Sequence, residues 1–358
     1  MTKNRLYGLD LLRIISMILI TLIHYIGYSR ILSNPSLHSF NGIILNMLSA
    51  LTTIAVNIFV LTTGYFSCEK KVNFKRIFFL WTQVVVISIA LTVIGFLCLN
   101  KSFSIVPIVK TFFPILTVHF WFFAMYVVLN ILSPFINVLV ANLSKKWHFA
   151  LCVLGFLIIS VFFVSNPLIS HYTYIANPRG ICWFVYLYIV GAYIKKHGIN
   201  VSKLILGLSG MVLFAGIFAL KFIGIEGYGN MKLTEDYSVL SLAFSVVAFA
   251  LFKDASIKAP FIQKIVTALS SCSFFVYIIQ EHDLIRNWYW GLFKINEYAS
   301  TPLICINLLV SVLALWPIAF IVSKLLSLLN PVFAWIYARV EKMVIWIMIK
   351  IKSKISLK

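Results

Sequence analysis

Charged residues are scarce in this chain, at 11% of 358 residues, where a typical soluble domain has about 25%. Only ten residues are acidic, 61% are hydrophobic, and the mean hydropathy is +0.99. A soluble fold cannot bury that much apolar surface. The composition therefore excludes a soluble globular protein and predicts an all-α polytopic membrane protein.

Several local patterns are also missing. The six cysteines occur singly and form no C-x-x-C pair, which argues against a disulfide framework or a zinc site, so we expect no metal. We find no Gly-rich phosphate loop, internal repeat, low-complexity linker or signal-peptide cleavage pattern. These absences favour one membrane domain over residues 1–330, followed by a tail over 331–358.

Positive charge, in contrast, is abundant, with a net charge of +20. Nucleic-acid binding is one explanation, but the positive-inside rule for cytoplasmic loops is the better one, and we expect no nucleic-acid partner. Apolar runs of about 20 residues predict about ten transmembrane helices. They lie near 8–28, 43–66, 77–99, 119–140, 149–165, 181–194, 204–223, 237–252, 267–285 and 302–328.

The distribution of lysine and arginine orients these spans. Twenty-one of the 30 fall in the two termini and the even-numbered connections, seven on the opposite side, and two inside spans. This asymmetry predicts that both termini are cytoplasmic. The tail mixes Trp335, Val340 and Trp346 with Arg339 and Lys350, which is typical of a basic amphipathic helix on anionic lipid. The alternative is an eleventh short span near 332–349.

The first span carries three polar residues in an apolar run, namely Asp10, Arg13 and His24. A charge in hydrocarbon is costly and indicates function. Arg13 and His24 are eleven residues apart, so they project from one helix face, about 16 Å apart along the axis. The predicted topology also brings His119 and the run Gln280, Glu281, His282 and Asp283 to the depth of His24. Their convergence in space is a hypothesis.

These residue types suggest acyl transfer across the membrane. A histidine near neutral pKa can act as general base toward a hydroxyl, and either Glu281 or Asp10 could orient it. Arg13, with Lys75 and Arg76 in a basic cytoplasmic loop, could bind the phosphates of a nucleotide-bearing donor. Each residue also has a simpler explanation: His24 as an interior histidine, His119 as an interfacial residue, the Gln280–Asp283 run as a solvated helix end, and the basic loop as a topology signal.

Six ordered motifs then resemble the acyltransferase 3 family of integral membrane O-acyltransferases, in the branch that modifies bacterial surface polysaccharides. They are Leu9-Asp10-Leu11-Leu12-Arg13 with His24, Thr63-Gly64-Tyr65-Phe66, Phe74-Lys75-Arg76-Ile77, His119-Phe120-Trp121 running to Ser133-Pro134-Phe135, Trp183-Phe184 to Tyr193, and Ser273 to Tyr277. The chain departs from the family where a common Tyr-x-x-His reads Tyr277-Ile-Ile-Gln280.

The resemblance implies acetyl-CoA or another acyl-CoA as cytoplasmic donor. It implies a hydroxyl of a cell-surface polysaccharide or an undecaprenyl-linked glycan as acceptor, at the bacterial cytoplasmic membrane. Arg13 and His24 would be the essential pair, with Arg76 on the donor side. A proton-coupled transporter or flippase of lipid-linked glycan, using His24, His119 and Glu281 as a relay, is the alternative. A structural or sensor membrane protein would leave Arg13 unexplained.

Overall fold

The computed structural model describes residues 5–34, 36–37, 39–99, 102–163, 180–224 and 233–355. Helices dominate these ranges, which contain no strand, so the all-α prediction is confirmed. In chain order they are α1 (Tyr7–Ser29), η1 (Ile31–Ser33), α2 (Ser39–Thr52), α3 (Ala55–Ser67), α4 (Phe74–Leu97), α5 (Ile105–Phe112), α6 (Trp121–Asn142), α7 (Lys145–Gly155), η2 (Phe156–Phe163), α8 (Ile181–His197), α9 (Lys203–Phe222), α10 (Val239–Lys253), α11 (Pro260–Glu281), α12 (Asp283–Leu292), η4 (Ile295–Tyr298), α13 (Ile304–Leu313), α14 (Leu315–Leu328) and α15 (Asn330–Ile355).

Eight helical stretches of the described chain are long and apolar enough to cross a membrane, which confirms a polytopic membrane protein. Two further predicted spans match α8 and α10, which have 17 and 15 residues. The number of crossings and the cytoplasmic side of the termini stay predictions. The eight stretches are Tyr7–Ser29, Phe40–Ser67, Phe74–Leu97, Trp121–Asn142, Lys145–Phe162, Lys203–Phe222, Pro260–Glu281 and Ile304–Leu328.

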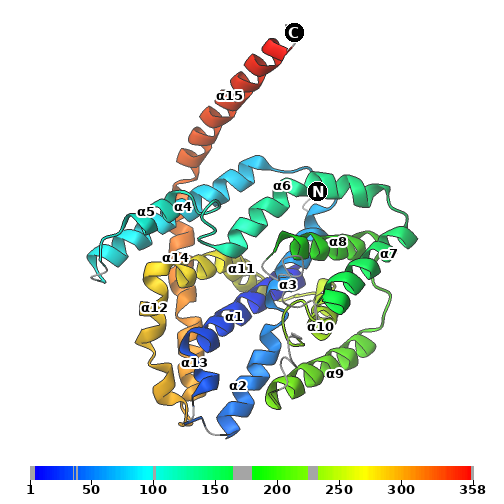
Figure 1. Ribbon diagram of the computed structural model, residues 1–358, viewed down its shortest axis with the longest axis vertical. Coiled ribbons are helices and arrows are strands. Elements are labelled where there is room, and N and C mark those ends of the chain that lie inside the picture. Colours follow the sequence, from blue (N-terminus) through cyan, green and yellow to red (C-terminus); the bar gives the residue numbers. More distant parts are fainter. Residues whose placement is uncertain are drawn as a thin grey trace.

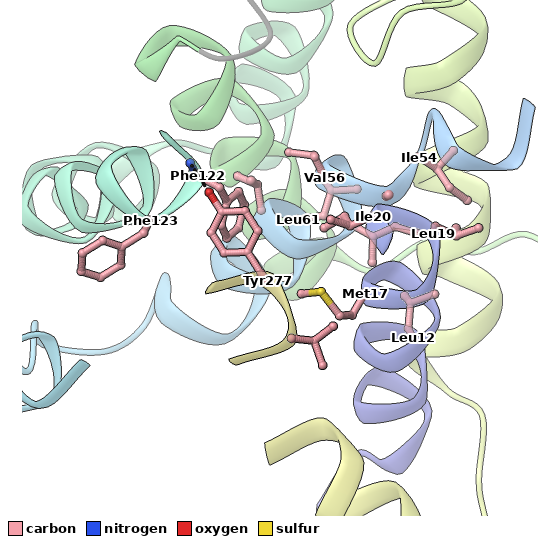
Figure 2. Close-up of a cluster of buried hydrophobic side chains, with 14 of the residues drawn as sticks. Leu12, Met17, Leu19, Ile20, Ile54, Val56, Leu61, Phe122, Phe123 and Tyr277 are labelled. Atoms are coloured by element: carbon pink, nitrogen blue, oxygen red, sulfur yellow. Dashed lines mark hydrogen bonds between the residues drawn. The ribbon is translucent and has the colours of Figure 1, made fainter. Parts of the chain in front are cut away.

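Helix α1 lies in the middle of the bundle (Figure 1), packed against α2, α3, α10, α11 and α13. Apolar side chains around α1, among them Leu12 and Met17, are nearly fully buried. Figure 2 shows them in a cluster with side chains of α3, α6 and α11. In this cluster the backbone N–H of Phe122 donates to the Tyr277 hydroxyl at 3.2 Å. The central position of α1 brings its polar residues within reach of several other helices.

Two glycines allow α3 and α8 to cross in close contact. A Cβ atom on Gly64 would lie 2.2 Å from the Tyr188 carbonyl oxygen, and one on Gly191 would lie 2.3 Å from the Leu61 carbonyl oxygen. Small residues at such crossings let helix backbones approach closely in membranes. Both glycines belong to sequence motifs noted above, so the requirement for glycine there follows from packing.

Several predicted spans differ in detail from the observed helices. The span 43–66 is broken between α2 and α3, where Thr52 and Thr53 donate their hydroxyls to the carbonyls of Ser49 and Ala50, at 2.7 and 3.0 Å. Such local side-chain bonds compete with helix continuation. The span 267–285 ends earlier, at Glu281, and α12 starts at Asp283. The span 302–328 divides into α13 and α14, and residues 164–165 of the span 149–165 lie outside the described residues.

The tail, predicted as an amphipathic helix, forms one 26-residue helix, α15. It contacts α4 and α14 near its start and then projects beyond the bundle (Figure 1). Phe333 and Tyr337 pack on Phe79 and Phe78 at ring-centroid distances of 6.0 and 5.4 Å. The predicted placement of this helix on lipid stays a prediction.

Candidate active site

His24 and Glu281 meet between α1 and α11. The His24 Nε2 atom lies 3.2 Å from Glu281 Oε1, and the two side chains are 13% and 10% exposed. His24 sits near the end of α1, and Glu281 is the last residue of α11. A buried carboxylate in contact with one imidazole nitrogen orients the ring and stabilises its protonated form. The pair therefore has the geometry of a general base with its orienting group.

Tyr28 and Arg286 complete the surroundings of Glu281. The Tyr28 hydroxyl donates to Glu281 Oε1 at 2.6 Å, and the Tyr28 ring lies 5.3 Å from the His24 ring. Arg286 Nη1 donates to the Tyr28 hydroxyl at 3.4 Å, and its guanidinium lies 5.0 Å from the centroid of that ring. Sequence reasoning missed Tyr28, although its four-residue spacing from His24 places both on one helix face.

A second polar group adjoins this pair, centred on Asp283. His119 Nδ1 and Lys110 Nζ lie 3.4 and 2.7 Å from Asp283 Oδ2, and the ring of His282 lies 5.2 Å from that of His119. The contact with His119, followed by that with Lys110, keeps the pKa of Asp283 below its ordinary value. Lys110 was not among the predicted site residues, because it lies between predicted spans, and Asp283 was noted only as a member of the polar run that begins at Gln280.

His282 faces away from Glu281, toward α4. Its Nε2 atom lies 3.3 Å from the Thr92 hydroxyl, which in turn lies 2.9 Å from the Thr111 hydroxyl. Burial, aided by His119, lowers the pKa of His282 to about 3. A histidine that is neutral at physiological pH can hold a hydrogen bond here but adds no positive charge.

The predicted convergence of the histidines is therefore present in the structure. The end of α11 contacts His24 through Glu281 and contacts His119 through His282 and Asp283. Gln280 donates to the Thr21 hydroxyl of α1 at 3.4 Å. Three helices and a loop thus bring the predicted residues of this end together.

Asp10 lies at the other end of α1. It accepts from Arg5 at 2.5 Å and from Ser270 at 3.1 Å, and its Oδ1 atom is 3.6 Å from Arg13 Nη1. Asp10 is fourteen residues from His24, or about 21 Å along a helix. Of the two carboxylates that sequence reasoning proposed to orient His24, the structure places Glu281 in contact with it and Asp10 far away.

Cations and aromatic rings gather around Arg13. The Arg13 guanidinium and the Lys70 ammonium lie 5.4 and 5.5 Å from the Phe66 ring, and Lys195 lies 5.1 Å from the Tyr65 ring. Arg76, like Arg5, lies within electrostatic range of Arg13, without a direct contact. We call Arg13, Lys70, Arg76 and Lys195 the basic cluster. Lys195 was missed, because a lysine at a helix end is explained by topology alone.

Lys75 and Arg76 lie in the first turn of α4. The Asn73 side chain caps this helix by accepting from the Arg76 backbone N–H at 2.9 Å. Lys75 lies over the ring of Phe79, 5.8 Å from its centroid, one turn along the same helix. The two predicted donor-binding residues of this turn thus have different surroundings, with Arg76 the one near Arg13.

Within the described part of the chain, no group of three or more His, Cys, Asp and Glu residues is arranged to hold a metal ion.

A family model described as an acyltransferase domain, that of acyltransferase 3, matches residues 6–329. Searches of curated proteins and of solved structures return no match. The matched range contains His24, Glu281 and the whole basic cluster, and it ends one residue before α15 begins.

Proposed function

This chain belongs to the acyltransferase 3 family, and we propose that it moves an acetyl group from cytoplasmic acetyl-CoA to a sugar hydroxyl of a surface polysaccharide or lipid-linked glycan. The single observation that carries the proposal is the contact of 3.2 Å between His24 and Glu281. It supplies an oriented base at the end of α1 that the predicted topology assigns to the outer face. The natural setting is a bacterial cytoplasmic membrane.

In this mechanism His24 removes the proton of the acceptor hydroxyl. Glu281 contacts Nε2, so Nδ1 is the atom that takes the proton, and Glu281 stabilises the imidazolium that forms. The hydroxyl oxygen attacks the thioester carbonyl carbon and forms the new ester bond. The carbon–sulfur bond breaks, and the CoA thiolate leaves with the proton that His24 returns.

The basic cluster holds the donor. Arg13, Lys70, Arg76 and Lys195 bring positive charge to the end of α1 that the predicted topology assigns to the cytoplasm. Such groups bind phosphates through charge-assisted hydrogen bonds. Arg13 and His24 are about 16 Å apart along the helix, a span comparable to the extended pantetheine arm of CoA. Phosphates bound at the cluster would thus allow the thioester to reach His24.

The test is the O-acetyl content of purified surface glycan, measured by proton NMR. It compares a deletion strain with strains expressing the wild-type chain, His24→Ala or His197→Ala. His197 is a partly exposed histidine at the end of α8, two residues after Lys195 and so at the Arg13 end of the site rather than beside His24, and it serves as the control for loss of a histidine. We expect the acetyl signal to disappear in the deletion and in His24→Ala only. Full acetylation with His24→Ala would contradict the proposal and would favour the transporter alternative.

A further inference from the structure

A cavity of about 370 Å³ lies beside the His24–Glu281 pair, between the end of α1 and the segment from α12 to η4. Cavities that hold small molecules have volumes of about 300 to 1,000 Å³. Tyr28 connects the cavity to the His24–Glu281 pair, because it lines the cavity and also donates a hydrogen bond to Glu281 at 2.6 Å. The cavity is therefore next to the oriented base.

The cavity combines flat apolar surface with short polar groups. Tyr28, Trp290 and Ile295 supply the apolar surface, while Asn287 and Asn296 are exposed amides at its edge. Trp290 is 5% exposed, and its indole N–H is a buried donor that has no partner in the described part of the chain. Buried donors are nearly always bonded in native proteins, so an unpaired one needs an explanation.

The charges at the edge of the cavity balance one another. Lys294 Nζ lies 3.3 Å from Glu297 Oε1, and both side chains are about two-thirds exposed, at 67% and 64%. Lys294 has a left-handed backbone conformation, with φ 45°, at the turn between α12 and η4. The pair leaves the cavity with no net charge, which favours an uncharged ligand.

Neighbouring contacts hold the cavity in shape. Asn296 donates to the Ser29 carbonyl at 2.8 Å and so ties η4 to the end of α1. The Tyr289 hydroxyl donates to the Ser311 carbonyl at 2.5 Å and ties α12 to α13. The walls are thus fixed by three elements that surround the end of α1.

We propose that this cavity binds an uncharged sugar ring of the acceptor, with its reacting hydroxyl directed past Tyr28 toward His24. A sugar ring has an apolar face of C–H groups, which packs on indole and phenol rings, and hydroxyls at its rim, which pair with amides. Tyr28, which is 38% exposed, supplies the ring face, and the exposed amide of Asn287 supplies a partner for a hydroxyl. The inference rests on the proposed acyl transfer and adds where, and by which residues, the acceptor is held.

Gly291 offers a way to fill the cavity. It lines the cavity, and a Cβ atom built on it meets no heavy atom within 4 Å, so a larger side chain can be added without a backbone clash. Gly207 of α9 is also free of contacts within 4 Å and does not line the cavity. Gly291→Trp and Gly207→Trp therefore form a matched pair. Asn287→Ala is a second variant, at an exposed position that does not endanger folding.

The experiment measures transfer of radiolabelled acetyl from acetyl-CoA in membrane vesicles that contain the full-length chain. The acceptor probe is surface glycan from the same cells, stripped of acetyl groups with mild alkali. We expect Gly291→Trp to raise the KM for the glycan at least about tenfold, and Asn287→Ala a few-fold. The KM for acetyl-CoA should not change in either variant, and Gly207→Trp should match the wild type.

Each outcome decides the inference. An unchanged glycan KM in Gly291→Trp, or an equal rise in both KM values, would overturn the sugar site while leaving the acyl transfer intact. Acetylation of an acidic sugar, identified by NMR of the product, would overturn the assignment to an uncharged ring. Absence of transfer by the wild type would refute the proposed function itself, which is a different result from a failure of Gly291→Trp alone.

Discussion

The two ends of α1 carry different kinds of polar group. At the His24 end, His24 and Glu281 are in contact and only 13% and 10% exposed, and Glu281 also accepts a hydrogen bond from the more exposed Tyr28. At the Arg13 end the cations lie over aromatic rings, and Arg13 itself is 32% exposed. Buried, bonded groups suit a proton transfer that needs fixed geometry. Partly exposed cations suit a large, flexible, solvated anion.

Replacing His24 should lower the transfer rate more than any other substitution. It tests whether the proton transfer takes place at the His24 end of α1. General base catalysis contributes about 100- to 10,000-fold, so we expect His24→Ala to lower kcat by that factor. The KM for acetyl-CoA should change little, because the basic cluster is intact. Transfer assays in vesicles check this, with His197→Ala as the control. A large rise in the donor KM with unchanged kcat would assign His24 to donor binding instead.

Replacing Glu281 by a neutral residue distinguishes the role of Glu281, which orients the His24 ring, from the role of His24 as the base. Glu281→Gln keeps the shape of the side chain and an oxygen that can accept from Tyr28. It loses the charge that stabilises the imidazolium, so we expect kcat to fall about 10- to 100-fold, less than for His24→Ala. The same vesicle assay measures it. A wild-type rate would mean that the contact with His24 is structural only.

Changes in the basic cluster should act on the donor alone. A hydrogen bond to a charged group contributes about 1.5 to 3 kcal/mol, so Arg13→Gln should raise the KM for acetyl-CoA about tenfold or more. The fold should persist, because Asp10 keeps Arg5 and Ser270 as partners.

Lys75 sharpens this test, because it lies over Phe79 rather than beside Arg13. Lys75→Gln should raise the donor KM less, by about twofold, as for a solvated charge. Lys203→Gln, at the exposed start of α9, is the control. Equal effects of Arg13→Gln and Lys75→Gln would contradict the division between the two residues.

Tyr28→Phe should have the smallest effect. It removes one hydrogen bond to Glu281 and leaves the ring against His24 and the cavity. A single such bond contributes about 0.5 to 1.5 kcal/mol, so kcat should fall a few-fold. Steady-state kinetics measures this. A loss as large as that of Glu281→Gln would make Tyr28 a direct participant in proton transfer.

The sequence indicated at which level along the helices the polar residues lie, but it gave little information on which helices are adjacent. Polar residues in apolar runs identified Arg13 and His24, and the expected topology brought Glu281 to the level of His24. Asn57, a polar residue within the second predicted span, bonds to two other helices: it accepts from the Trp183 indole at 3.0 Å and donates to Ser245 at 3.0 Å. Depth follows from hydropathy because water and lipid differ strongly in polarity.

The packing of helices side by side is harder to predict from the sequence. Lipid tails and neighbouring helices are equally apolar, so hydropathy does not show which face of a helix meets which partner. Lys195 therefore gave no signal of its proximity to Tyr65. The break at Thr52 and Thr53 was also missed, because it depends on local hydroxyl bonds that interrupt no apolar run.

The junction of α11 and α12 has a mechanical consequence. Glu281, His282 and Asp283 are consecutive, yet they contact α1, α4 and α5 respectively, through His24, Thr92 and Lys110. Because the three residues are joined directly through the backbone, a displacement of one is passed in part to the others. A tilt of α4 or α5 is therefore transmitted to Glu281 and to the base that it holds. Strain applied on the α5 side of the bundle, whether by lipid thickness or by a bound partner, would thus tune the rate without any contact to substrate.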